Sequence, residues 1–289
     1  MKEMSSTIGG RRLAYWRSAV PGSGPDHDRP AASRTVLLLH GLSADHEGLL
    51  TLTRMWPDTH VVAPDLPGFG RSDPLDGKHS LTNYAHTMEA LCADLDLRDL
   101  TVVGHSLGAS IAVTLAAAYP DRVRALVLIS PVAAGNGPGT WLIRGYYGLG
   151  AVLPSWAARR WFLSKVAVYL SDRSMFASTD RRVRRQILEA DYRSAALACP
   201  RAIVEIYHSV RGARLTTIAG RVSAATVVVG GERDRMAPPS ALAALHQHLP
   251  HSELHVIPRA GHLWSVEEPG IATRVILSSL ARLAGPVVA

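Results

Sequence analysis

The sequence predicts an α/β fold, with a mostly parallel sheet flanked by helices, and three observations lead to this expectation. Short apolar runs of four or five residues recur along the chain and have the length of buried strands. Each run ends in a turn rich in glycine, proline or polar residues. At least one run leads through such a turn into a helix-like segment. With 289 residues, of which 47% are hydrophobic, the chain can bury a large core.

The first predicted elements are a hairpin and two strands. Residues 8–16 have the pattern of a hairpin that turns at Gly9-Gly10. Residues 36–39 predict a buried strand that runs into His40-Gly41-Leu42, and residues 60–63 predict the next strand. The sheet therefore begins near the start of the chain.

A G-x-S-x-G pattern follows the third predicted strand. Residues 100–103 form an apolar run, Gly104-His105-Ser106-Leu107-Gly108 follows, and residues 109–116 read as a helix. A serine on such a strand–turn–helix connection has a strained backbone and a projecting hydroxyl, and the two glycines permit the close approach of neighbouring chain. The pattern alone is weak evidence, but this context makes it specific.

An acidic residue and a histidine follow two of the remaining predicted strands. Residues 125–129 predict one strand, and residues 225–229 predict another that leads into Gly230-Gly231-Glu232-Arg233-Asp234. Residues 254–257 predict a last strand before Ala260-Gly261-His262, and a helix over 239–249 fits between the two. A serine, an aspartate and a histidine thus each follow the end of a strand, in that order.

These residues closely resemble the α/β-hydrolase superfamily, whose catalytic triad runs Ser, Asp or Glu, His along the chain. The likeness extends from the hairpin at 8–16 to Glu267-Glu268-Pro269 and omits roughly 135–215. The resemblance implies an α/β-hydrolase fold with an eight-stranded, mostly parallel sheet and an inserted helical cap, or lid. It divides the chain into a core of residues 1–134 and 216–289 and a cap of residues 135–215.

The chemistry of a serine hydrolase then assigns three roles. Ser106 is the nucleophile, His262 is the base that takes its proton, and Asp234 orients the imidazole. Glu232 is a chemically acceptable alternative acid, although Asp234 better matches the Gly-x-x-Asp placement of the family. Asp65 precedes the nucleophile, and its Pro-Asp-x-Pro-Gly surroundings indicate a turn-stabilising role.

Backbone donors must stabilise the oxyanion of a tetrahedral intermediate. The candidates are the N–H of Leu107, directly after the nucleophile, and the N–H of Leu42, after His40-Gly41. His40 resembles the histidine of the family's His-Gly pair, which orients this loop. His105 is expected to be structural and to lie behind the turn.

Ten of the seventeen aromatic residues lie between 135 and 215. This composition predicts a largely helical cap over an apolar pocket that suits a hydrophobic acyl or ring-bearing substrate. Many of these aromatic residues must pack the cap onto the core, because Tyr146, Leu149, Leu153 and Trp156 recur at helical spacing. The candidate pocket residues are His40, Trp141, Tyr146, Trp156, Trp161 and Trp264.

The net charge of +7 is concentrated in the predicted cap. Residues 135–215 hold 13 Lys or Arg against 5 Asp or Glu, whereas the rest of the chain holds 18 against 19. The excess could attract an acidic or carrier-linked substrate, but a solvated helix face such as residues 181–188 is the favoured interpretation. Nucleic acid is not an expected partner, because no recognised binding module accompanies the basic residues.

Several classes of protein are disfavoured by what the sequence lacks. No apolar run approaches the ~18 residues of a membrane span, and residues 1–10 lack a secretory signal. We therefore expect a cytoplasmic protein. Cys92 and Cys199 lie far apart and predict no disulfide framework, and no group of residues has metal-ligand spacing, so neither a metal nor another cofactor is expected. The oligomeric state stays open.

The leading functional hypothesis is hydrolysis of a carboxylic ester, thioester or lactone of a hydrophobic small molecule through an acyl-serine intermediate. A serine nucleophile, rather than aspartate, argues against haloalkane dehalogenase or epoxide hydrolase chemistry. Hydrolysis of a carbon–carbon bond, or an acyl transfer or cyclisation in small-molecule biosynthesis, could use the same triad. A ligand receptor with vestigial hydrolysis is a further, less favoured alternative.

Overall fold

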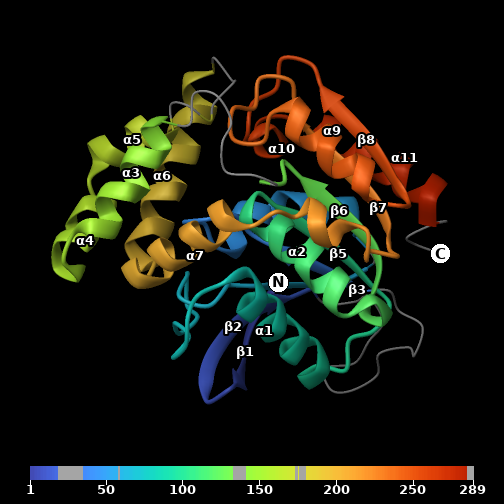
Figure 1. The fold of residues 1–289 in the computed structure, drawn as a ribbon, viewed down its shortest axis with the longest axis horizontal. Coiled ribbons are helices and arrows are strands. Elements are labelled where there is room, and N and C mark those ends of the chain that lie inside the picture. Colours follow the sequence, from blue (N-terminus) through green and yellow to red (C-terminus); the bar gives the residue numbers. More distant parts are fainter. Residues whose placement is uncertain (19–34, 58, 133–140, 173–174, 176–179, 285–289) are drawn as a thin grey trace.

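A computed structural model describes residues 1–18, 35–57, 59–132, 141–172, 175 and 180–284. At its centre lies an eight-stranded sheet with the order β1-β2-β4-β3-β5-β6-β7-β8 (Figure 1). Only β1–β2 and β2–β4 pair antiparallel, and the other neighbours are parallel. The predicted α/β class with an eight-stranded, mostly parallel sheet is confirmed. The strands are β1 (Lys2–Ile8), β2 (Arg11–Arg17), β3 (Thr35–Leu39), β4 (His60–Pro64), β5 (Leu100–His105), β6 (Val123–Ile129), β7 (Ala225–Gly231) and β8 (Ser252–Ile257).

The central strands are apolar on both sides because helices cover both faces of the sheet. Every residue of β3, β4 and β5 is buried, as expected for parallel strands between two helical layers. Leu37 and Leu39 point into one core, whereas Val36 and Leu38 point into the other. The alternation follows from the two-residue period of a strand.

The core helices divide between these two faces. Side chains of α1, α2, α8 and α9 belong to the larger hydrophobic core, and those of η1, α10 and α11 belong to the core on the opposite face. The short η2 (Pro120–Arg122) leads into β6. The bounds are α1 (Leu81–Asp94), α2 (Leu107–Ala118), α8 (Thr216–Ala219), α9 (Pro239–His248), α10 (Trp264–Glu267), α11 (Pro269–Ala284) and η1 (His46–Met55).

Of the helices described between β6 and β7, the five from α3 to α7 lie to one side of the sheet (Figure 1). They form two layers, because α6 and α7 lie nearer the core and α3, α4 and α5 pack against them and one another. The predicted boundary at residues 134 and 135 falls outside the described residues. The helices are α3 (Trp141–Val152), α4 (Ser155–Phe162), α5 (Lys165–Asp172), α6 (Arg181–Leu197) and α7 (Pro200–Gly212).

The inner layer is attached to the core by buried polar contacts. On α7, the carboxylate of Glu205 accepts hydrogen bonds from the backbone N–H and Nδ1 of His79, at 2.8 and 2.9 Å. His79 is fully buried, and its Nε2 accepts from the backbone N–H of Leu75. On α6, the Ser194 hydroxyl donates to the Asp45 carboxylate at 2.8 Å. Both inner helices therefore have a fixed position on the core.

Tyr146 and Trp156, which recur at helical spacing in the sequence, do not lie on one continuous helical face. Helix α3 ends at Val152, and α4 begins only after Pro154, which lacks the backbone N–H that a helix interior requires. Tyr146 is buried, whereas Leu149 and Trp156 are exposed. The break changes the helical phase, so Trp156 on α4 does not continue the face of Tyr146 on α3.

Two further observations concern the cysteines and the possibility of a membrane span. Cys92 on α1 and Cys199 before α7 are both free. Across the described parts of the chain, no helix has the length and apolar character needed to cross a membrane.

Candidate active site

Ser106 occupies a sharp turn between β5 and α2. Its φ of 54° and ψ of −112° lie outside the regions that a non-glycine residue usually adopts. A Cβ at Gly104 would collide with the backbone of Gly108, and a Cβ at Gly108 would collide with the carbonyl of Leu39. The two glycines of the motif are therefore required where strand and helix pass each other. The strained turn exposes the Ser106 hydroxyl at the carboxyl edge of the sheet.

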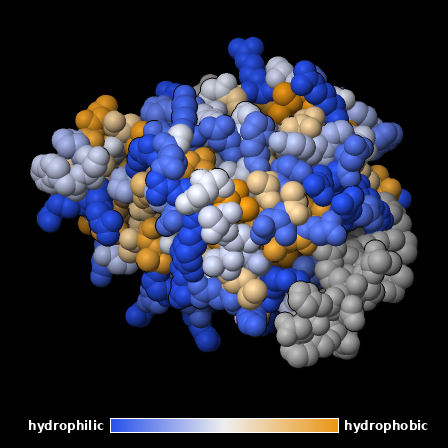
Figure 2. Space-filling view, turned by 90° about the horizontal axis from the view of Figure 1, so that it is seen from below, coloured by the Kyte–Doolittle hydropathy of each residue, from blue (hydrophilic) through white to orange (hydrophobic). Residues whose placement is uncertain are grey.

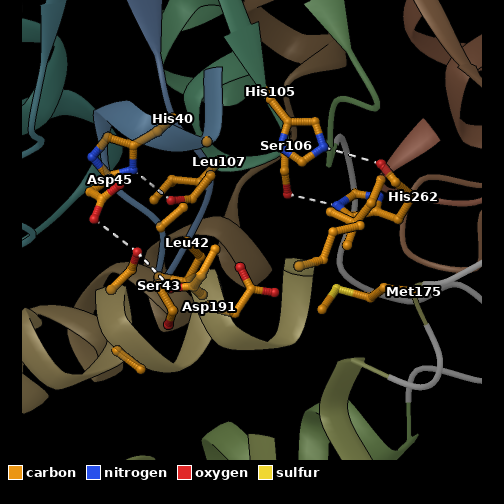
Figure 3. Close-up of a pocket in the computed structure, with 18 of the residues that line it drawn as sticks. His40, Leu42, Ser43, Asp45, His105, Ser106, Leu107, Met175, Asp191 and His262 are labelled. Carbon is orange, nitrogen blue, oxygen red and sulfur yellow. Dashed lines mark hydrogen bonds between the residues drawn. The ribbon is translucent and has the colours of Figure 1, made fainter. Parts of the chain in front are cut away.

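The three predicted catalytic side chains lie together in one hydrogen-bonded relay. His262 Nε2 lies 2.9 Å from the Ser106 hydroxyl, and His262 Nδ1 lies 2.8 Å from Asp234 Oδ2. The three residues come from the turns after β5, β7 and β8. Figure 3 shows the His262 imidazole facing Ser106 across the cavity edge. With Nδ1–H donating to Asp234, Nε2 is free to accept the serine proton.

Asp234 is itself held in place by backbone donors. Its Oδ1 accepts from the N–H groups of Met236 and Ala237 at 2.8 and 2.9 Å. Burial acts to raise the pKa of this carboxyl, but the neighbouring His262 charge and the hydrogen bonds lower the pKa below its ordinary value. Asp234 therefore stays ionised although it is only 3% exposed.

The structure separates Glu232 from the relay. Its Oε2 accepts the backbone N–H of Arg259 at 2.8 Å, in the turn after β8. Of the two candidate acids, only Asp234 contacts His262. Both acids lie in the turn after β7, and the offset of two residues directs their carboxylates to different partners.

The loop after β3 brings a second backbone donor toward Ser106. A Cβ added to Gly41 would lie 3.2 Å from the His105 ring and 3.6 Å from the Ser106 Cβ, so the absence of a side chain permits this close approach. Leu42 follows directly, and Leu107 is the first residue of α2, whose N–H has no intrahelical acceptor. Both residues line the same cavity as Ser106. Their N–H groups are accordingly candidates for an oxyanion site.

His40 is a neutral support for this loop. The backbone N–H of Leu66 donates to His40 Nε2 at 2.9 Å, so Nδ1 carries the proton and donates to the carbonyl of Gly41 at 2.8 Å. Burial lowers the pKa of His40 and outweighs the opposing attraction of Asp65. With both ring nitrogens engaged, His40 orients the loop.

His105 supports the opposite side of the turn. Its Nε2 donates to the backbone carbonyl of His262 at 3.1 Å. Burial, together with the nearby His262 charge, lowers the pKa of His105 to about 4, so the ring is neutral at neutral pH. His105 therefore links the Ser106 turn to the His262 turn through one hydrogen bond.

Asp65 stabilises turns away from the relay. Its carboxylate accepts from the backbone N–H and Nδ1 of His46 and from the backbone N–H of Arg71. Burial opposes ionisation, but the hydrogen bond from His46 and the other contacts lower the pKa of Asp65. The carboxylate thus joins η1 to the loop after β4, in agreement with the turn-stabilising role read from its surroundings.

A cavity of about 430 Å³ lies between the relay and the cap helices. The turns of the core form one wall through Ser106, His262 and the 40–45 loop, and α6 forms the facing wall (Figure 3). Several lining residues are not among the predicted pocket residues, because the sequence does not show which side chains of the cap face the cavity. These are Arg144, Met175, Ile187, Asp191, Ser194, Tyr207 and Arg211.

Two of the six predicted pocket residues, His40 and Tyr146, line this cavity. Trp141 and Trp156 lie instead on outward helix faces, 70% and 71% exposed. Their helices fill the inward side with Tyr146, Tyr147 and Phe162, so the indoles are directed to solvent.

The other two tryptophans also lie outside the cavity lining. Trp161 packs beside Tyr146 and donates its Nε1–H to the Tyr146 carbonyl at 2.7 Å. Trp264 is completely buried in the core that contains η1 and α11. Because α10 begins directly after the His262 turn, its first residue faces that opposite side of the sheet.

Within the described ranges, no group of three or more His, Cys, Asp or Glu side chains could hold a metal ion. At the core side of the cavity, the relay lies beside the two candidate oxyanion donors. Their arrangement has the elements of nucleophilic acyl chemistry: a nucleophile, a base, an orienting acid and oxyanion donors.

Comparison with known proteins identifies the class. A family model described as the alpha/beta hydrolase fold matches residues 34–269. The chain belongs to this family, and its general activity is that of a hydrolase.

Individual relatives cover nearly the whole chain. One, from Bacillus subtilis (strain 168), is 26% identical over 92% of this chain and 96% of its own, and is provisionally named a 2-succinyl-6-hydroxy-2,4-cyclohexadiene-1-carboxylate synthase. A second, from Cupriavidus pinatubonensis, is a 2-hydroxy-6-oxononadienedioate/2-hydroxy-6-oxononatrienedioate hydrolase, 28% identical over 88% of this chain and 89% of its own. A solved esterase structure from Thermogutta terrifontis aligns with a TM-score of 0.79 at 22% identity, covering 98% of this chain and all of that one.

Proposed function

We propose that this protein is a serine hydrolase that cleaves a carboxylic ester, thioester or lactone of a hydrophobic small molecule through an acyl-Ser106 intermediate. The observation that carries the proposal is the Ser106–His262–Asp234 relay at the edge of the cavity. A serine hydroxyl is a weak nucleophile at neutral pH and needs an adjacent base. His262 lies within hydrogen-bond distance of it, and Asp234 orients the base.

In the first step, the Ser106 oxygen attacks the substrate carbonyl carbon while its proton moves to His262 Nε2. The carbonyl π electrons move to oxygen, and the N–H groups of Leu42 and Leu107 stabilise the resulting negative charge. The ionised Asp234 accepts the Nδ1–H hydrogen bond and stabilises the imidazolium. The oxyanion then re-forms the carbonyl and the leaving group departs with the proton from His262.

The second step reverses the roles. A water molecule gives a proton to His262 Nε2 as its oxygen attacks the acyl-serine carbonyl. The second tetrahedral intermediate collapses, Ser106 oxygen leaves and recovers the proton from His262, and the acid product is released. The net reaction adds one water across the scissile bond and requires no cofactor.

We propose that residues 135–215 act as a cap that selects the substrate. The cavity wall from the cap helices is largely apolar, through Tyr146, Tyr147, Val168 and Ile187, which favours a hydrophobic acyl or ring-bearing group. Arg144 and Arg211 border the cavity together with the carboxylates of Asp45, Glu47 and Asp191, so an acidic or carrier-linked substrate would need to place its charge beside Arg144 or Arg211. The substrate would be enclosed between the cap and Ser106.

The names of two relatives favour a second candidate function. One relative hydrolyses oxo-dienedioate compounds and another is provisionally a carboxylate synthase. Cleavage of a carbon–carbon bond, or an acyl transfer or cyclisation, would use the same relay with a different leaving group or acceptor. Product analysis with a 2-hydroxy-6-oxo-dienoate distinguishes these reactions from ester hydrolysis, because carbon–carbon cleavage yields a dienoate and a second carboxylic acid.

Turnover of p-nitrophenyl butyrate by the wild type and by Ser106→Ala tests the mechanism. We expect the substitution to lower kcat by about 10⁴-fold or more, since the nucleophile is lost. Ser278→Ala, at an exposed serine of α11, is the matched control and should retain turnover. Activity of Ser106→Ala at the wild-type rate would eliminate acyl-serine chemistry.

A fluorophosphonate probe separates an enzyme from a receptor. An activated serine reacts with the probe, so we expect one label per chain, located at Ser106 and lost in Ser106→Ala. Folded wild-type protein that takes up no label would instead support the ligand-receptor alternative.

A further inference from the structure

The outer layer of the cap exposes an unusual number of large apolar side chains. Nine such side chains are exposed in the described parts of the chain, and six of them lie on α3, α4 and α5. These three helices pack against one another, and exposed apolar surface of this kind often marks an interaction site. The six are Trp141, Leu149, Val152, Trp156, Val166 and Tyr169.

These residues lie on the outward faces of their helices. On α3, Trp141, Leu149 and Val152 follow the spacing of one helix face, and the opposite face buries Tyr146 and Tyr147. On α4, the buried residues are Ala158 and Phe162, and Trp156 points away from them. The exposed residues are therefore surplus to the packing of the cap.

Positive charge accompanies the apolar surface. Arg159 and Arg160 are exposed on the same side of α4 as Trp156, and Lys165 is exposed at the start of α5 beside Val166. Neither α3 nor α4 contains an acidic residue. Figure 2 shows hydrophobic and pale side chains among blue ones at the cap end of the molecule. We call the six apolar residues with Arg159, Arg160 and Lys165 the cap outer surface.

We propose that the cap outer surface docks onto an anionic phospholipid bilayer. Indole and phenol rings together with Lys or Arg side chains have the composition of helices that lie in a lipid interface, where the rings enter the headgroup region and the cations contact anionic lipid. No described helix is suited to cross a membrane, so the contact is peripheral.

Charge favours the bilayer over a second copy of the chain. A symmetric dimer through this surface would place the Arg159, Arg160 and Lys165 cations of both copies in one interface, to which α3 and α4 contribute no acidic residue. A bilayer with negative headgroups gains from both the apolar and the cationic groups. The proposal extends beyond the hydrolase reaction and does not depend on it, because neither Trp141 nor Trp156 lines the cavity.

Vesicle sedimentation of the full chain tests the proposal. We expect binding to vesicles of phosphatidylcholine with about 30% phosphatidylglycerol, and at least about tenfold weaker binding to pure phosphatidylcholine. The double variant Trp141→Ser/Trp156→Ser should weaken binding to the anionic vesicles by about tenfold or more. Arg159→Gln/Arg160→Gln should weaken it and reduce its sensitivity to salt.

Matched controls come from exposed residues elsewhere. Leu197→Ser/Val256→Ser removes two exposed apolar side chains outside this surface, and Arg181→Gln/Arg182→Gln removes two exposed charges from α6. Both should bind within about twofold of the wild type. Circular dichroism and p-nitrophenyl butyrate turnover verify that each variant is folded.

Three results would overturn the proposal. One is no sedimentation of folded wild type with anionic vesicles at low salt. Another is equal binding to anionic vesicles by the wild type and Trp141→Ser/Trp156→Ser. This result would mean that the binding is only the general electrostatic attraction of a basic protein to anionic lipid. The third is a dimer in light scattering that this double variant dissociates, which would assign the surface to a second copy.

Discussion

Replacing His105 by asparagine should make the stability of this protein less dependent on pH. His105 is buried behind the Ser106 turn, and burial with the His262 charge lowers its pKa to about 4. In the unfolded chain, a histidine titrates near pH ~6.5. Between these values the unfolded chain binds a proton that the folded protein does not, so acid favours unfolding.

The size of the effect follows from the two pKa values. The contribution of His105 to stability is complete above pH ~6.5 and is lost as the pH falls toward 4. Linkage gives a loss of about 2 kcal/mol at pH 5 and about 3 kcal/mol at pH 4. Burial also lowers the pKa of His40 and His79, so the total loss in the wild type should exceed the share of His105.

Urea unfolding followed by circular dichroism at pH 7.5 and pH 5.0 measures this loss. The free energy of unfolding of the wild type should be lower at pH 5.0 than at pH 7.5. We expect this decrease to be about 2 kcal/mol smaller in His105→Asn than in the wild type. His251 is exposed, and His251→Asn should keep the wild-type difference. An unchanged difference in His105→Asn would refute the assignment of His105 as a buried neutral side chain.

Two further substitutions test the contacts of the site. Asp234→Asn should lower kcat for p-nitrophenyl butyrate by about 10⁴-fold, because an amide favours the wrong tautomer of His262. Glu232→Gln should retain kcat, because the Glu232 carboxylate contacts a backbone N–H of the turn after β8. A large loss of kcat in Glu232→Gln, with kcat retained in Asp234→Asn, would identify Glu232 as the acid. Ser194→Ala should lower the free energy of unfolding by about 1–3 kcal/mol and raise KM, because buried Asp45 loses a donor at the cavity wall. The exposed Ser278→Ala is its control in urea unfolding, and equal stability of the two variants would argue against the α6 attachment.

Much of the core fold was predictable because its signals are local. Runs of apolar residues bounded by turns located the central strands, and the observed β3, β5, β6 and β7 extend those runs by only a few residues. Gly104 and Gly108 flank Ser106 at a fixed spacing, and the reason is steric. The order of strand ends likewise placed the serine, aspartate and histidine in sequence.

The cap was predictable only as a set of helices. Trp141 and Trp156 were expected at the pocket because the cap is rich in aromatic residues, but composition does not say which face of a helix meets the core. Pro154 separates α3 from α4, so the helical spacing that included Trp156 continues across a break. Trp264 lies only two residues beyond His262, and yet the start of α10 directs it into the opposite core.

The sequence by itself determined the class of fold, the strained turn at Ser106 and the order of the relay residues, because each depends on neighbours within a few positions. Tertiary structure alone decided that α6 supplies the facing cavity wall and that two tryptophans remain in solvent. These outcomes depend on how separate helices and turns are oriented in space. That orientation arises from contacts between residues far apart in the chain, such as His105 and His262, which are 157 positions apart.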